Sequence, residues 1–310
     1  MYDIATKEDA VKAETHSALS DPSKFFKGVT AVVAASIAYG IMPIFTKTAL
    51  NEGMKADSVV FYRFVLSTLF SAVFLWRSSC KMSISRKQFR HLLIFGILGF
   101  GMTINLLTAS YQYIPVGLAT MFHFAYPLVI LLVMAFFYQE KMTLFKAAVI
   151  LIAVAGIILL ADFSQGLSPK GAALALLSAV TYAAFIIAGR KSSFAAMPSM
   201  EVIFFVCLFS SVIFGGKSIL AGTLQLPPSR TAFGCLLVIS LFCTVFALKM
   251  LTYGIRALGA STSSMLNMLE PVVSVIAGTL IFSEALNIRT VTGCILIVAA
   301  SILTVKGDRQ

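Results

Sequence analysis

The chain has 310 residues, of which 59% are hydrophobic and only 12% are charged, and its mean hydropathy is +0.93. These values lie far outside the range of soluble domains and indicate a polytopic membrane protein. A formal net charge of +11 is also found in nucleic-acid binders, but its distribution along this chain points to membrane topology instead.

Ten apolar segments reach the length of roughly 20 residues that crosses a hydrocarbon core of about 30 Å. The polar residues 1–26 precede them and lack the short apolar core and the cleavage site of a secretory signal, so the first span is expected to stay in the membrane. The short connections leave no room for a soluble catalytic domain. The predicted spans are residues 28–50, 57–76, 89–111, 117–137, 143–161, 170–189, 197–216, 232–254, 260–282 and 288–305.

Basic residues predict the orientation of these spans. With the amino terminus placed in the cytoplasm, sixteen of the 24 Lys and Arg residues fall in inner segments and five in outer loops. An excess of Lys and Arg is typical of the loops on the cytoplasmic side of a membrane protein. We therefore expect a multi-pass protein of the cytoplasmic membrane with both termini in the cytoplasm.

Few positions within the first five spans are polar. Arg63 lies about two turns inside the predicted outer boundary, where its guanidinium can reach water or bond backbone carbonyls, so it is a candidate gate or outer-side charge. Asn105 follows in the third span, and His123 and Tyr126 share one face of the fourth. His123 is either a packing residue or a proton carrier, since imidazole titrates near neutral pH. Pro127 removes a helix hydrogen bond and predicts a kink.

Glu270 lies in the ninth span, about ten residues from either end. An ionised carboxylate there costs at least about 2.5 kcal/mol on insertion scales, so Glu270 is expected to face protein or water. Asn267 and Pro271 lie on the same helix face, and Pro271 predicts a second kink. Lys249, in the eighth span, either pairs with Glu270 and holds two helices together or extends its charge to the inner surface.

The two halves of the chain repeat one another. Offsets of 143 residues early and 144 residues late in each half align Tyr39 with Tyr182, Lys47 with Arg190, Met121 with Met265, and Pro127 with Pro271. Each half holds five spans, an odd number, so the second half must enter the membrane from the opposite side. Such inverted repeats are typical of secondary transporters, although some channels have them too. We expect a polar tail at 1–26, a first repeat at 27–161 and an inverted second repeat at 168–306.

A resemblance to EamA-type members of the drug/metabolite transporter superfamily is carried by YPLVILLVMAFFYQEKMT (126–143), EPVVSVIAGTLIFSEALN (270–287), FYRFVLS (61–67) and YQYIPVGLAT (111–120). The resemblance covers residues 28–305. It implies an all-α fold of ten transmembrane helices, arranged as two inverted five-helix bundles around a central cavity, with alternating access and export or exchange of small metabolites. Val206 aligns with Arg63, so any role of that arginine belongs to the first half alone.

Polar positions that correspond between the halves predict a central cavity. The pairs are Asn105/Lys249, His123/Asn267, Tyr126/Glu270 and Tyr39/Tyr182. We predict that Lys249 and Glu270 offer opposite charges to a zwitterionic metabolite such as an amino acid, while the neutral groups supply hydrogen bonds. Glu270 either binds a cationic group of the substrate or carries the coupling proton, and His123 is the second candidate for proton coupling.

The sequence thus predicts a secondary transporter that exports an amino acid or a related compound, with protons as the candidate coupling ion. A broad-specificity exporter of drugs or amphiphiles and an uncoupled channel or facilitator are the alternatives. No GxSxG or HExxH motif supports an enzyme, and no CxxC pair or Cys/His cluster predicts a metal or another cofactor. The expected partners are a small-molecule substrate, the lipid bilayer and protons, without nucleic acid, and the expected assembly is a monomer or a weak homodimer.

Overall fold

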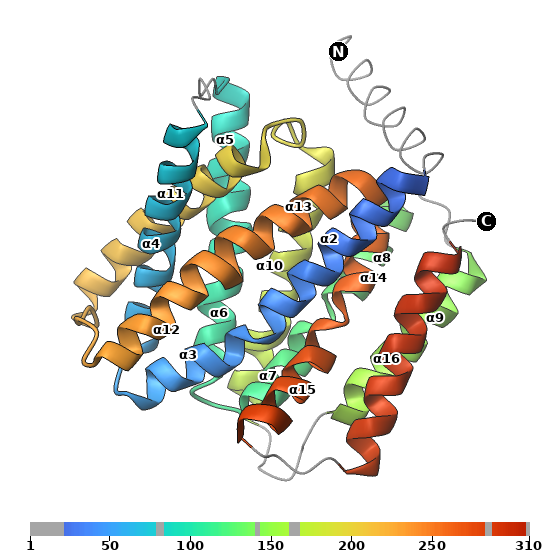
Figure 1. The fold of residues 1–310 in the computed structure, drawn as a ribbon. Coiled ribbons are helices and arrows are strands. Elements are labelled where there is room, and N and C mark those ends of the chain that lie inside the picture. Colours follow the sequence, from blue (N-terminus) through green and yellow to red (C-terminus); the bar gives the residue numbers. More distant parts are fainter. Residues whose placement is uncertain (1–21, 79–83, 140–142, 161–167, 283–286, 308–310) are drawn as a thin grey trace.

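The computed structural model describes residues 22–78, 84–139, 143–160, 168–282 and 287–307, which together form a bundle of helices (Figure 1). Residues 1–21 of the predicted tail lie outside this part. Within the described residues, nine helical stretches are long and apolar enough to cross a membrane, and Leu144–Leu160 is a shorter apolar helix of 17 residues. These ten stretches match the ten predicted spans in order, so the prediction of an all-α, polytopic membrane protein is confirmed.

The first half contains five spans. Its elements are α2 (Pro22–Gly40), α3 (Met42–Asn51), α4 (Ala56–Arg77), α5 (Arg86–Ile94), the π-helical η1 (Phe95–Gly101), α6 (Met102–Ser110), α7 (Val116–His123), α8 (Tyr126–Tyr138) and α9 (Leu144–Leu160). The second half has α10 (Pro169–Lys191), α11 (Ser199–Leu220), α12 (Arg230–Ser240), the π-helical η2 (Leu241–Phe246), α13 (Ala247–Leu258), α14 (Ala260–Asn267), α15 (Glu270–Phe282) and α16 (Ile288–Gly307).

The two halves interrupt their helices at corresponding places. The third span of each half contains a π-helical segment, η1 or η2. The helix of the fourth span breaks after His123 in the first half, four residues before Pro127, and after Asn267 in the second half, four residues before Pro271. A proline ring clashes with the carbonyl four residues earlier and lacks an N–H, so the helix ends there and a new one begins with the proline in its first turn.

Helices from the two halves pack against each other in a reciprocal pattern. The first span of each half lies against the third span of the other, as α2 with α13 and α10 with α6. The second spans pack together as α4 with α11, and the fifth spans as α9 with α16, the pair at one edge of Figure 1. Gly156 and Gly293 let α9 and α16 approach closely, because a Cβ on either residue would lie within 2.8 Å of the carbonyl oxygen of the other.

Burial follows the distance from the centre of the bundle. Aromatic side chains of α2, α4, η1, α8, α10 and α11 belong to one central core, whereas large apolar side chains such as Trp76, Phe136 and Leu280 are exposed on the outside. An exposed apolar belt of this extent suits contact with lipid. The buried polar groups therefore stand out at the centre, and they define the candidate site.

Candidate functional site

Glu270 begins α15 at the centre of the protein, with only 8% of its surface exposed. Its Oε2 accepts a hydrogen bond from Nδ2 of Asn267 at 3.3 Å, and the same amide nitrogen donates to the Tyr126 hydroxyl at 3.0 Å. Oδ1 of Asn267 in turn accepts from the Ser36 hydroxyl at 3.1 Å. The break after Asn267 places the carboxylate at a helix amino terminus, where the helix dipole favours a negative charge. Glu270 therefore faces protein rather than an open cavity.

Arg63 supplies a buried positive charge to the same region. Its Nε donates to the Thr244 hydroxyl at 2.8 Å and its NH2 to the Cys243 carbonyl at 3.4 Å, both in η2. No ion pair joins Arg63 to Glu270 among the described residues, but the guanidinium lies within electrostatic range of the carboxylate. Only 3% of Arg63 is exposed, so of the two contacts expected for its guanidinium, water or a backbone carbonyl, the bond to a carbonyl is the one present. A π-helical turn frees such carbonyls, which explains why the arginine binds there.

Aromatic rings form one wall of this centre. The rings of Tyr126 and Tyr182 meet edge to face at 4.8 Å, and His123 lies 5.4 Å from the first and 5.3 Å from the second. Nδ1 of His123 is 2.9 Å from the Ser178 hydroxyl, which donates to the Ala175 carbonyl at 2.6 Å. Because that hydroxyl proton is already used, we assign Nδ1 of His123 as the donor.

Tyr39 completes the group from α2. Its hydroxyl is buried beside Tyr182 and makes no hydrogen bond of regular geometry among the described residues, and it lies within electrostatic range of Arg63 and Glu270. The structure thus brings together six of the predicted cavity residues, but in a packed cluster, which we call the buried polar centre: Tyr39, His123, Tyr126, Tyr182, Asn267 and Glu270.

Lys249 does not join the buried polar centre. Its side chain is exposed on α13, whereas its neighbours Leu248 and Leu251 are buried, so the predicted charge pair with Glu270 is not formed. Only the alignment with Asn105 in the repeat predicts a cavity position for Lys249. The η2 segment just before it has a wider turn and rotates the residues that follow, so Lys249 points away.

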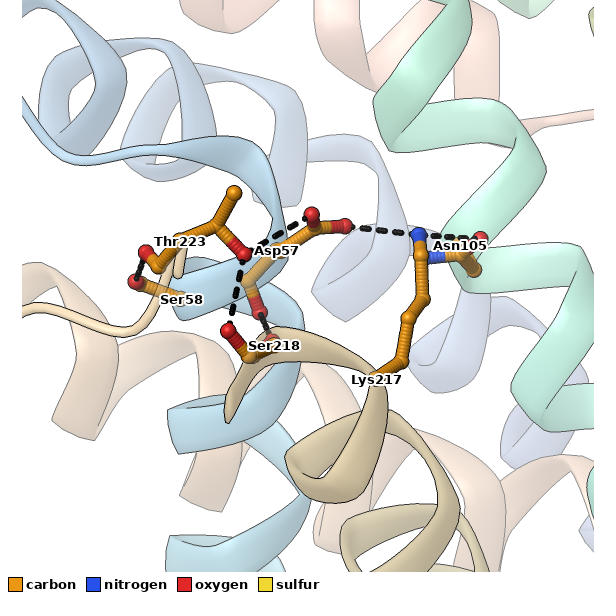
Figure 2. A network of polar contacts seen from close by, with 6 residues as sticks. All are labelled: Asp57, Ser58, Asn105, Lys217, Ser218 and Thr223. Carbon is orange, nitrogen blue, oxygen red and sulfur yellow. Dashed lines mark hydrogen bonds and ion pairs between the residues drawn. The ribbon is translucent and has the colours of Figure 1, made fainter. Parts of the chain in front are cut away.

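Asn105 also lies elsewhere, in a network at the ends of α4 and α11 (Figure 2). Its Oδ1 accepts from Nζ of Lys217 at 3.3 Å, and Lys217 forms an ion pair with Asp57 at 2.7 Å. The second oxygen of Asp57 accepts from the Thr223 hydroxyl at 3.1 Å. Lys217 is one of the five basic residues expected in outer loops, and the repeat offers no signal for this pair, since it aligns Asp57 with Met200.

A cavity of about 1300 Å³ adjoins the buried polar centre. The two helical spans that carry His123 and Glu270 contribute to its lining, among other residues through Thr120, Pro271, Ser274 and Gly278. Pro271 follows Glu270 directly, and Phe124, another wall residue, packs against Tyr126. The cavity therefore lies directly beside the buried polar centre, at Phe124 and Pro271.

Comparison with known proteins agrees with this architecture. The model of the EamA-like transporter family matches residues 26–161 and again residues 169–306. A solved crystal structure superposes with a TM-score of 0.78 at 18% identity, covering 91% of this chain and 99% of its own, which shows the shared fold.

Several relatives by sequence are transporters. An uncharacterized transporter of Archaeoglobus fulgidus is 24% identical, over 78% of this chain and 85% of its own. S-adenosylmethionine uptake transporters of Rickettsia felis and Rickettsia prowazekii are 25% and 26% identical, each over 84% of this chain and 86% of their own. Because the family model matches both halves of the sequence, this chain belongs to the EamA-like transporter family and is a multi-pass membrane transporter rather than an enzyme.

Proposed function

We propose that this protein carries an amino acid or an amino-acid derivative with a positive charge across the cytoplasmic membrane by alternating access between two inverted repeats. The observation that carries the proposal is the Glu270 carboxylate, which lies buried among aromatic rings directly behind the wall of a cavity. The matching helix breaks and the reciprocal packing of the two halves support the inverted arrangement.

The buried polar centre has the chemistry of a cation site. A carboxylate attracts a positive charge directly, and the faces of Tyr126 and Tyr182 attract it through their electron density. Arg63 balances the charge of Glu270 in the absence of substrate, but its hydrogen bonds go to Thr244, to Cys243 and to the Met42 sulfur and not, among the described residues, to Glu270. The carboxylate is therefore free to exchange its electrostatic partner for a cationic group.

S-adenosylmethionine is the first substrate to test, because relatives of this chain are named as its uptake transporters. The molecule joins an amino-acid group to a sulfonium cation, and both its positive groups suit a carboxylate lined by aromatic rings. A cavity of about 1300 Å³ exceeds the typical ligand pocket of about 300–1000 Å³, so a nucleoside derivative has room to enter.

The test is counterflow in proteoliposomes that are loaded with unlabelled S-adenosylmethionine and given the labelled compound outside. S-adenosylhomocysteine is the matched competitor, because it lacks only the methyl group and the sulfonium charge. We expect strong competition by unlabelled S-adenosylmethionine and weak competition by S-adenosylhomocysteine, and we expect the Glu270→Gln variant to lose this preference. Equal competition by the two compounds would contradict a cation site.

Direction and coupling are measured in the same vesicles. Net export, the direction expected from the sequence, requires efflux from loaded vesicles, whereas uptake requires entry into empty ones. If Glu270 carries the coupling proton, Glu270→Gln should keep counterflow but lose accumulation driven by a pH gradient. Competition by lipophilic cations of unrelated shape, without competition by amino acids, would favour the broad-specificity exporter instead.

A further inference from the structure

Two arginines join helix ends on the side of the molecule away from the cavity. NH1 of Arg190, in the last turn of α10, donates to the backbone carbonyl of Arg256 at 3.1 Å. NH2 of Arg256, in the last turn of α13, donates to the carbonyl of Met197 in the α10–α11 connection. We call Arg190, Arg256 and Met197 the far-end latch, because together they hold the ends of α10, α13 and this connection against one another.

The far-end latch and the cavity mouth lie at opposite ends of the bundle. Ala257 and Leu258, next to Arg256, contact Gly28 near the start of the span Ser23–Asn51. The cavity is lined instead by residues near the other end of that span, including Lys47. Figure 1 shows α13 and α2 running side by side between these two ends.

Each latch residue has a counterpart in the first half of the chain. The offset of 143 residues aligns Arg190 with Lys47 and Met197 with Met54, and the offset of 144 aligns Arg256 with Gln112. All three counterparts line the cavity: Lys47, Met54 and Gln112. Lys47 and Gln112 are exposed there, and no hydrogen bond joins the three among the described residues. The positions that are hydrogen-bonded to one another at the far end are thus not hydrogen-bonded to one another at the cavity.

From this correspondence we propose that Lys47, Gln112 and Met54 form a second latch, the mouth latch, which closes the cavity in the opposite state of the transport cycle. The inference rests on the proposed alternating access between inverted repeats. In the closed state, Nζ of Lys47 donates to the Gln112 carbonyl and the Gln112 side-chain amide donates to the Met54 carbonyl, as Arg190 and Arg256 do at the far end. The bonds of the far-end latch break as these form.

The two latches differ in strength because their donors differ. Arg190 and Arg256 each present a guanidinium with five N–H donors, whereas Gln112 presents a neutral amide. Hydrogen bonds from charged donors are roughly twice as strong as those between neutral groups. The far-end latch is therefore the stronger of the two, which agrees with a resting state in which the cavity is open.

This difference makes Gln112→Arg a gain-of-function test. Replacing a neutral donor with a charged one should shift the population toward the mouth-closed state by roughly tenfold. Gln112→Leu is the matched control, since it removes the donor at the same exposed position. Arg256→Gln should move the population in the same direction as Gln112→Arg, because it weakens the far-end latch.

The population of the mouth-closed state is measured from the distance between spin labels at Thr48 and Gly117, which both line the cavity. The shorter label distance corresponds to the mouth-closed state. A side chain at Gly117 meets no atom within 4 Å, so the label is tolerated. We expect a larger share of the short distance in Gln112→Arg than in the unsubstituted protein, and no increase in Gln112→Leu. No increase in Gln112→Arg, or an equal increase in Gln112→Leu, would overturn the mouth latch.

A second readout needs no label pair. A single cysteine at Thr48 should react with a membrane-impermeant maleimide more slowly when Gln112→Arg is present, and an unchanged rate would also overturn the proposal. Neither measurement uses a substrate. If the distance shifts in Gln112→Arg while no amino-acid derivative is transported, the mouth latch stands and the substrate assignment fails. If an amino-acid derivative is transported but the distance does not shift, the substrate assignment stands and the mouth latch fails.

Discussion

Arg63→Met tests whether the arginine is the counter-charge that lets Glu270 stay buried. The change removes the guanidinium but keeps much of the side-chain volume, and it leaves a carboxylate that is 8% exposed without a nearby positive charge. Removing one partner of a buried pair costs about 3–5 kcal/mol. Because Arg63 bonds to Thr244 and Cys243 rather than to Glu270, we expect the lower end, a loss of about 3 kcal/mol in the free energy of unfolding.

The assay is unfolding of the detergent-solubilised protein by added denaturing surfactant, in a double-mutant cycle. Glu270→Gln removes the negative charge, so the variant with both changes should lose less stability than the sum of the two single losses, by about 1–3 kcal/mol. Lys217→Met is the control, since the side chains of Lys217 and Asp57 are 47% and 23% exposed and such a pair contributes about 0.2–1 kcal/mol. A loss below about 1 kcal/mol for Arg63→Met, or strictly additive losses in the cycle, would refute the reasoning.

Three further predictions concern glycines. Gly293→Ala should lower the free energy of unfolding by about 1–3 kcal/mol, because its Cβ would lie 2.7 Å from the Gly156 carbonyl oxygen, and a neutral effect on thermal unfolding would argue against this contact. Gly234→Ala, in a helix with open space around it, should instead stabilise by about 0.5–1 kcal/mol in the same assay; destabilisation would contradict it. Gly40→Ala places a Cβ 2.7 Å from the Glu270 carbonyl oxygen, so it should displace the start of α15 and slow counterflow, and an unchanged counterflow rate would show that α15 need not hold this position.

Local properties of the chain were predictable. The apolar stretches define the spans, because a helix in lipid must satisfy its own backbone groups and needs a minimum length to cross. The helix breaks were predictable from Pro127 and Pro271, since a proline acts on the backbone within its own turn. The buried position of Glu270 followed from its place midway along an apolar span, and its family followed from the repeated motifs.

Only the tertiary structure decided which polar residues meet. Arg63 turned inward to η2, Lys249 turned outward on α13, and Asn105 joined Asp57 and Lys217 at another place. The direction of a side chain depends on the rotation of its helix, and the π-helical segments change that rotation by an amount that the hydropathy pattern does not encode. Sequence therefore determined where each helix crosses and breaks, whereas packing between the halves determined which charges are neighbours.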